Sequence, residues 1–119
     1  MRNILRQLLK IPSVSGREGK LGEYIAGEMR SYFDTVRTDA LGNVICHKNG
    51  TGKKLLFCAH MDEIGFIVTF IEEDGFLRCA PVGGIDWNAA AYSRVVFENG
   101  RSGVLIPEDG VKPEDYKGD

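Results

Sequence analysis

The sequence contains little histidine or cysteine, the residues whose nitrogen and sulfur atoms bind transition metals. Only two histidines and three cysteines occur among its 119 residues. The cysteines are odd in number and none has C-x-x-C spacing, which argues against a disulfide scaffold. Because unpaired thiols are typical of a reducing compartment, we expect a cytoplasmic protein.

Two further absences limit the partners that the chain can have. Fifteen basic and 17 acidic residues give a net charge of −2, so the positive charge that nucleic-acid binding needs is missing. The longest apolar runs, such as residues 55–59, are far too short to cross a bilayer. Residues 1–10 have scattered charges and do not resemble a secretory signal. We therefore expect neither a nucleic-acid partner nor a membrane partner.

Glycine, in contrast, is abundant, with 15 residues, and this predicts a turn-rich chain with short strands. Apolar residues first repeat at helical spacing, which predicts one helix over about the first ten residues and a second over about 17–32. Pro12 ends the first helix, because the residue before a proline avoids helical geometry. Ser15 and Glu18 have the spacing of a capping box at the start of the second helix.

Segments with strand character follow, separated by turn residues. The expected strands are 35–38, 44–47, 55–59, 66–72, 76–80, 93–98 and 101–106. Residues 55–59 are apolar without alternation, which predicts a strand covered on both faces. Asn99 and Gly100 between the last two strands are a strong hairpin signal. Residues 107–119 hold five acids against two lysines, and this composition predicts a loose tail.

The chemistry that the residues allow is concentrated at His60, directly after the apolar run. Catalytic groups in covered sheets gather at the carboxyl ends of strands. Asp62 could accept a hydrogen bond from one ring nitrogen of His60 and leave the other nitrogen to bind a metal, and Glu63 adds an oxygen donor. The alternative interpretation is a polar strand end with two solvated carboxylates.

A cysteine nucleophile is a weaker hypothesis. Cys46 and His47 are sequence neighbours, so on a strand they point to opposite faces. Cys58 and His60 could share a face, but a cysteine in an apolar run is expected to be a small buried residue. We expect His47 to be exposed beside a turn.

Five short motifs, taken in order, resemble those of the glutamyl/deblocking aminopeptidases. These motifs are SVSGRE at 13–18, DALGNV at 39–44, AHMDEIGF at 59–66, EDGFL at 73–77 and VGG at 82–84. The family comprises dinuclear metallopeptidases, some of which have been labelled cellulase M or endoglucanase. The resemblance extends from Leu9 to about Gly103, and its most specific part is the block from His60 to Phe66.

The resemblance implies an α/β fold made of parts of two domains. Family members have a three-layer αβα catalytic domain that is interrupted by an inserted PDZ-like β domain. Residues 1–64 would be the amino-terminal part of the catalytic domain, residues 65–106 a partial inserted domain, and residues 107–119 an acidic loose tail. His60 matches the first metal ligand of the family, and Asp62 matches the carboxylate that orients this ligand.

The implied activity is the hydrolysis of amino-terminal residues from peptides. The family uses two divalent metal ions, zinc or cobalt, and forms large cytoplasmic homo-oligomers. Its members are much longer than this chain, and their other metal ligands and glutamate base would follow Asp119. We therefore expect the chain alone to be inactive and to bind no metal tightly. Residues 88–92 also depart from the family pattern.

Two other functions compete with this interpretation. The β hairpins over 66–106 could form a non-catalytic binding or oligomerisation module with open edge strands. Carbohydrate hydrolysis would need two carboxylates on either side of a sugar, and Asp62 and Glu63 are too close in sequence for that arrangement. Whatever the function, two helices cannot cover the 55–59 strand fully, which predicts exposed apolar surface and self-association or a rearranged β-rich fold.

Overall fold

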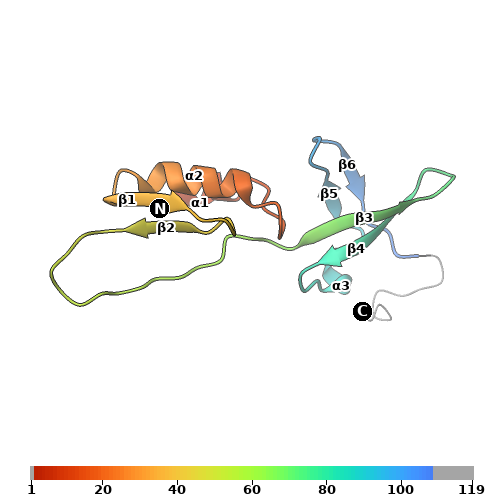
Figure 1. The fold of residues 1–119 in the computed structure, drawn as a ribbon. Helices are drawn as coiled ribbons and strands as arrows, with labels where there is room; N and C mark the ends of the chain where they lie inside the picture. The colour runs from red at the N-terminus through yellow and green to blue at the C-terminus, as the bar shows by residue number, and fades with distance from the viewer. Residues whose placement is uncertain (1, 109–119) are drawn as a thin grey trace. The chain divides into compact units, whose positions relative to one another are not determined.

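The chain forms two compact units, unit 1 (Met1–Glu63) and unit 2 (Ile64–Asp119). The computed structural model describes residues 2–108, so the predicted tail, apart from residues 107 and 108, lies outside the described residues (Figure 1). Helices and strands both occur, so the prediction of a mixed α/β chain is confirmed. Within residues 2–108, no helix has both the length and the apolar character needed to cross a membrane.

Unit 1 consists of two helices and one hairpin. Helices α1 (Arg2–Leu8) and α2 (Gly19–Met29) precede the antiparallel strands β1 (Thr35–Thr38) and β2 (Val44–His47). Helix α2 lies along this hairpin (Figure 1).

The core of unit 1 lies on the inner face of α2. Leu21 and Ala26 are its buried apolar side chains. Gly22 faces the packing partners of the helix, because a Cβ atom there would be in ordinary contact, 3.6 Å from Val44 Cγ2 and 3.7 Å from Met61 Cε. The packing therefore joins the helix both to β2 and to the segment that contains His60.

The predicted capping box at the start of α2 is wrong. Gly16 has φ +86° and the Arg17 N–H donates to the Val14 carbonyl over 2.7 Å, so the chain turns before the helix begins. Glu18 takes the N-cap position without a side-chain capping bond, and its Oε1 accepts from the Gly16 N–H at 2.7 Å. Ser15 is thereby separated from the helix start, and its hydroxyl donates elsewhere.

In its described part, residues 64–108, unit 2 has two hairpins and a short helix. Strands β3 (Gly65–Ile71) and β4 (Leu77–Val82) form the first hairpin, and β5 (Arg94–Val96) and β6 (Ser102–Val104) form the second. Helix α3 (Trp87–Ala90) lies between them in sequence. The Asp86 side chain caps α3 by accepting from the Asn88 N–H at 3.0 Å.

The three hairpins found in residues 2–108 close with the same kind of turn. A glycine in the left-handed region ends each loop: Gly42 at φ 87°, Gly75 at 92° and Gly100 at 82°. The N–H of each glycine donates to the carbonyl three residues earlier, over 3.1, 3.0 and 2.8 Å respectively. These are three-residue loops, a common hairpin connection in which only glycine avoids backbone strain. The Asn99-Gly100 hairpin is therefore confirmed, but its strands are shorter than predicted.

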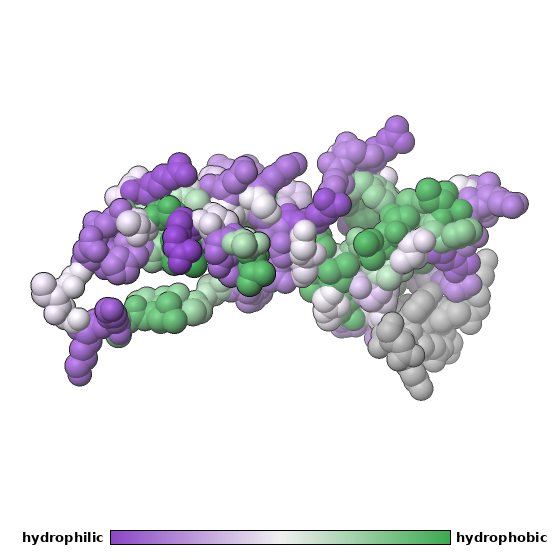
Figure 2. Space-filling view, in the orientation of Figure 1, coloured by the Kyte–Doolittle hydropathy of each residue, from purple (hydrophilic) through white to green (hydrophobic). Residues whose placement is uncertain are grey.

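The predicted strand over 55–59 is wrong. Residues 48–62 form a wide loop without helix or strand (Figure 1). Leu55, Leu56 and Phe57 are 80, 87 and 90% exposed, and apolar surface is visible along this loop in Figure 2. An apolar run becomes a buried strand only beside partner strands, and no strand of residues 2–108 pairs with this run. The expected exposed apolar surface is thus confirmed.

Candidate functional site

The candidate site lies where two distant segments of unit 1 are hydrogen-bonded together. Val14 and Glu63 form a parallel β-bridge. The Glu63 N–H donates to the Ser13 carbonyl over 2.9 Å, and the Ser13 N–H donates to Glu63 Oε1 over 3.0 Å. A longer bond of 3.4 Å runs from the Ser15 N–H to the Glu63 carbonyl. These bonds fix residues 60–63 against residues 13–15.

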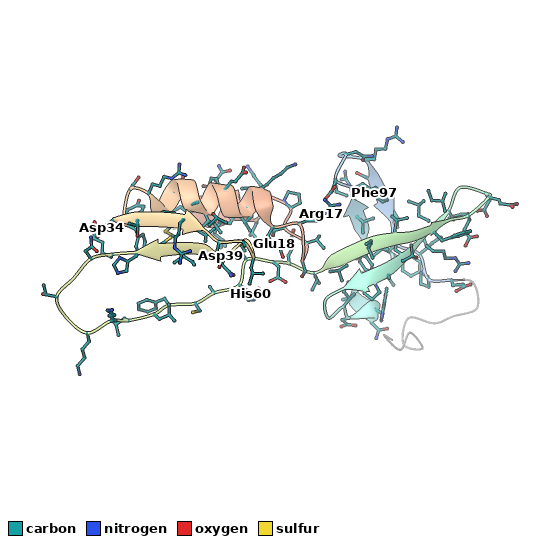
Figure 3. The ribbon with its side chains drawn as sticks, viewed as in Figure 1. Arg17, Glu18, Asp34, Asp39, His60 and Phe97 are labelled. Atoms are coloured by element: carbon teal, nitrogen blue, oxygen red, sulfur yellow. The ribbon has the colours of Figure 1, made fainter. Side chains whose placement is uncertain are left out.

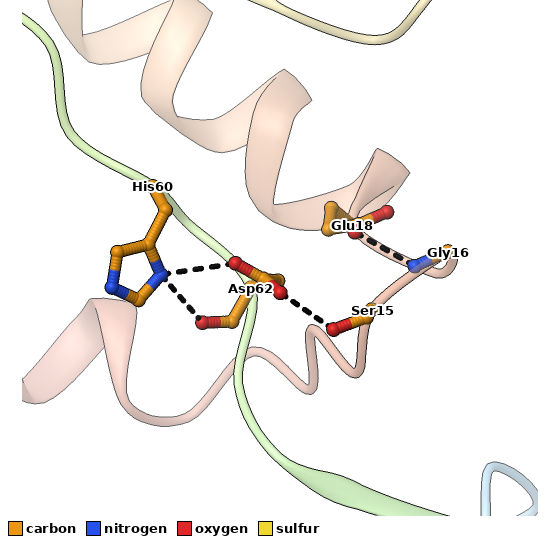
Figure 4. A network of polar contacts seen from close by, with 5 residues as sticks. All are labelled: Ser15, Gly16, Glu18, His60 and Asp62. Carbon is orange, nitrogen blue, oxygen red and sulfur yellow. Dashed lines mark hydrogen bonds and ion pairs between the residues drawn. The ribbon is translucent and has the colours of Figure 1, made fainter. Parts of the chain in front are cut away.

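His60, Asp62 and Ser15 form a connected polar network in this place (Figure 4). His60 Nδ1 lies 2.9 Å from Asp62 Oδ1 and 3.2 Å from the Asp62 carbonyl oxygen. The second carboxylate oxygen, Oδ2, accepts from the Ser15 hydroxyl over 2.5 Å. The hydrogen bond expected between Asp62 and one ring nitrogen of His60 is therefore present. With its proton on Nδ1, the ring leaves the Nε2 lone pair free.

The network keeps Asp62 in its charged form. The Ser15 hydroxyl, and after it the His60 ring, lower the pKa of the Asp62 carboxyl group by hydrogen bonding. A carboxylate has only acceptor atoms, so it can hold the Nδ1 proton of His60. The imidazole side chain is 86% exposed and projects from the last part of the loop over residues 48–62 (Figure 3). Its Nε2 is therefore accessible.

The side chains present fit part of a metal site. His60 has the arrangement of a metal-binding histidine, with one nitrogen available and the other hydrogen-bonded to a carboxylate. Glu63 is less available than expected, since its Oε1 already accepts from the Ser13 N–H. Among residues 2–108, no group of three or more His, Cys, Asp or Glu side chains is placed to hold a metal ion. A catalytic zinc needs about three protein ligands, so the side chains described around His60 do not form such a set by themselves.

The remaining candidates do not join this network. His47 is exposed at the end of β2, as predicted. Cys58 is exposed, so the expectation of a buried thiol is wrong, because the run that contains it has no sheet around it. The residues that the sequence did not reveal are Ser13 and Ser15. Their SVSG motif was visible, but its spacing to Glu18 indicated a helix cap instead of a contact with Asp62.

Comparisons with known proteins place the chain in a family. The sequence model of the M42 glutamyl aminopeptidases matches residues 42–111, which include His60 and Asp62. A relative from Acetivibrio thermocellus is 42% identical over 117 residues, which cover 98% of this chain and 35% of the relative.

Solved structures agree with this assignment. An endoglucanase from Thermotoga maritima aligns with a TM-score of 0.79 and 40% identity over 93% of this chain and 36% of its own. The TET1 peptidase of Pyrococcus horikoshii, which can assemble into a tetrahedron or a large octahedral shell, aligns with a TM-score of 0.72 and 36% identity over 91% of this chain and 34% of its own. The chain thus spans about a third of the length of these relatives. It belongs to the M42 glutamyl aminopeptidase family, as its motifs predicted.

Proposed function

We propose that the chain is the amino-terminal part of a metal-dependent aminopeptidase that releases amino-terminal residues from peptides. The observation that carries the proposal is the His60 ring, with Nδ1 held by Asp62 at 2.9 Å and Nε2 free, within a motif of this family. His60 binds one of two divalent ions, zinc or cobalt, through Nε2. Asp62 orients the ring and is the positioning residue for that ligand.

The metal pair supplies Lewis-acid chemistry when bound, by polarising the scissile carbonyl group and lowering the pKa of a water molecule. The part of the chain that the structure describes contributes the oriented imidazole and the carboxylate behind it. Among residues 2–108, no three His, Cys, Asp or Glu side chains come together as a full ligand set. We therefore propose that the 119-residue chain is inactive by itself.

The proposal extends to domain layout and assembly. Residues 1–64 belong to a three-layer αβα catalytic domain, and residues 65–106 begin an inserted PDZ-like β domain. The enzyme is cytoplasmic and forms a homo-oligomer; the assembly named for the Pyrococcus horikoshii TET1 peptidase supports the oligomer. The exposed apolar run at 55–59 also favours association, because surface of this kind is unfavourable in water.

The proposal does not extend to glycoside hydrolysis, despite the name of the Thermotoga maritima neighbour. That reaction needs two carboxylates on opposite sides of a glycosidic bond. Asp62 and Glu63 are adjacent in sequence, and each already accepts a hydrogen bond from residues 13–15.

A hybrid enzyme tests the proposed activity. This chain replaces the segment of the Acetivibrio thermocellus relative that it matches, 35% of that protein, and hydrolysis of aminoacyl anilides is measured with and without a chelator. We expect chelator-sensitive hydrolysis by the hybrid, no hydrolysis by the isolated chain, and loss of activity in His60→Ala. The matched control is His47→Ala, which replaces the other histidine and is expected to keep the activity. Full activity in His60→Ala, or chelator-sensitive hydrolysis by the isolated chain, would contradict the proposal.

The competing function is a non-catalytic β-rich module. It is favoured by one observation, that within residues 64–108 each hairpin is two-stranded, so that no further described strand pairs with its edges. If that function is correct, His60→Ala has no effect, and substitutions on β3 or β5 change assembly.

A further inference from the structure

We infer that Ser15 is a positioning residue for His60, acting through Asp62. The inference rests on the proposed role of His60 as a metal ligand and adds a residue to which neither the family resemblance nor the comparisons give a role. The Ser15 hydroxyl donates to Asp62 Oδ2 over 2.5 Å, and Asp62 Oδ1 lies 2.9 Å from His60 Nδ1 (Figure 4). Each carboxylate oxygen therefore has its own partner.

The Ser15 hydroxyl fixes the rotation of the Asp62 carboxylate. A carboxylate with one bound oxygen can rotate about its last side-chain bond, and that torsion has broad minima. Water competes for its oxygens here, because the Asp62 side chain is 39% exposed. The second bond, from Ser15, holds the carboxylate plane and so keeps Oδ1 in line with the ring nitrogen.

The backbone around the site is held by other bonds. The Val14–Glu63 bridge and the two bonds between Ser13 and Glu63 join the segments without using the Ser15 side chain. The Gly16 turn places Ser15 facing Asp62, 47 residues away in sequence. Because Ser15 is exposed, removal of its hydroxyl leaves neither a cavity nor an unpaired buried atom. Its loss therefore affects the orientation of the site more than the fold of unit 1.

The orientation has a chemical consequence at the ring. A neutral histidine has one proton, and the hydrogen bond at one nitrogen selects which nitrogen carries it. Asp62 selects Nδ1–H and so leaves Nε2 as the metal-binding atom. When Asp62 rotates away, the proton is free to move to Nε2, where it blocks metal binding.

The test is the tautomer of His60 in the 119-residue chain labelled with 13C and 15N at histidine. Imidazole 15N and 13Cδ2 chemical shifts are recorded at about pH 8, where an ordinary histidine is neutral. The chain has only two histidines, so His47 is an internal control. The variants are Ser15→Ala, Ser15→Thr, which keeps the hydroxyl, and Ser31→Ala, which removes an exposed hydroxyl in the turn after α2.

We expect His60 to be mainly the Nδ1–H tautomer in the wild type, in Ser15→Thr and in Ser31→Ala. In Ser15→Ala we expect the signals of His60 to move toward the Nε2–H tautomer, with those of His47 and the melting temperature unchanged. Unchanged His60 signals in Ser15→Ala would overturn the inference. Equal changes at both histidines, or loss of the fold in Ser15→Ala, would overturn it too, because they indicate a general structural role.

The experiment is independent of catalysis, since it needs neither metal nor substrate. If the hybrid enzyme is inactive but the tautomer changes as expected, the proposed function fails and the positioning network stands. If the hybrid is active but the tautomer does not respond, the inference fails alone. In an active hybrid, Ser15→Ala should weaken metal affinity about tenfold, the lower end of the effect of groups behind a metal ligand.

Discussion

The two units differ in where their residues are buried and in how far apart their contacts lie in the sequence. In unit 1, a helix packs on a hairpin, and Ser13, Leu21 and Ala26 are buried. Over the described part of unit 2, residues 64–108, no residue is buried. Its strands pair only with their neighbours along the chain, whereas unit 1 also joins residues 13–15 to residues 62–63.

This difference shows why the candidate site lies in unit 1. A metal ligand needs a fixed orientation, and orientation comes from contacts between segments that cannot move independently. Residues 60–63 obtain such contacts from residues 13–15 and from the packing of Met61 near Gly22. Unit 2 has the geometry of hairpins, which are marginal in water without a packed face. We therefore expect the units to respond differently to the same kind of change.

The largest effect is expected for Leu21→Ala, which truncates a buried side chain of unit 1 that is 5% exposed. Truncation of a buried leucine costs about 2–5 kcal/mol, so we expect loss of cooperative unfolding in unit 1. Urea unfolding followed by circular dichroism measures it. Leu9→Ala is the control, because Leu9 is 73% exposed and a change there stays within about 0.5 kcal/mol. Equal effects of both substitutions would remove the distinction between a packed unit 1 and an open unit 2.

The next effect concerns self-association through the apolar run of unit 1. Leu56→Lys combined with Phe57→Lys places two charges on side chains that are 87 and 90% exposed. We expect the purified chain to shift from oligomers toward monomer in sedimentation velocity, because like charges oppose contact between apolar segments. Leu41→Lys is the control, as a single exposed apolar residue in a turn. An unchanged distribution in the double variant would show that another surface drives assembly.

A smaller effect is expected for Gly75→Ala in the β3–β4 turn. Gly75 has φ +92° and an added Cβ would meet no atom within 4 Å, so the change isolates backbone strain. That strain costs about 1–2 kcal/mol for a residue with a side chain. We expect a loss of unit 2 structure in amide hydrogen exchange while unit 1 keeps its protection. Gly84→Ala in the same unit, also in open space but without a positive φ, should have almost no effect.

The smallest effect is a dependence of stability on acid. The carboxyl groups of Asp34, Asp39 and Asp62, all in unit 1, have lowered pKa values, mainly through hydrogen bonds from Asn49, Asn43 and Ser15 respectively. A carboxyl group with a lowered pKa stabilises the fold fully when the pH is above the ordinary aspartate pKa of about 3.9. This stabilisation is lost as the pH falls through the lowered pKa of the folded state. Thermal melts of unit 1 should therefore weaken below about pH 4.

Asp39→Asn tests the origin of this acid dependence. The Asp39 carboxylate accepts from the N–H groups of Leu41 and Asn43 and from Asn43 Nδ2, at 3.0, 2.9 and 2.9 Å. Its replacement should lower the melting temperature at neutral pH and reduce the slope of melting temperature against pH below pH 4. A variant with the wild-type slope would show that the acid dependence arises elsewhere.

The sequence was sufficient for the hairpin turns and for the contact between His60 and Asp62, which depend on residues close together. Hairpin turns contain their own signal, because each needs a glycine three residues after the residue that opens it, as at Gly42, Gly75 and Gly100. The contact between His60 and Asp62 spans two residues and was expected for the same reason. Helix α3 was missed, although Asp86 is a good N-cap residue, because four residues have too short an apolar pattern to indicate a helix.

What the sequence could not provide depends on distant partners. Residues 55–59 have the composition of a buried strand, but composition does not specify which segments would pair with it. Ser15 has the spacing of a helix cap relative to Glu18, and its actual partner Asp62 is 47 residues away. The local pattern was wrong in both the partner and the direction of the bond, because a capping serine accepts from a backbone N–H, whereas the Ser15 hydroxyl donates to Asp62.

The bridge between Val14 and Glu63 has a consequence for the order of folding. Two hydrogen bonds that involve side chains join these segments, from Ser15 to Asp62 and from Ser13 to Glu63, and their partners are 47 and 50 residues apart in the sequence. In each hairpin turn, by contrast, the bonded residues are three positions apart. Contacts that enclose long stretches of chain are slow to form, because the entropy of the whole enclosed segment is lost before any bond is gained. The turns should therefore form first on a growing polypeptide. His60 would acquire its orientation only after residue 63 has emerged from the ribosome and returned to the amino terminus.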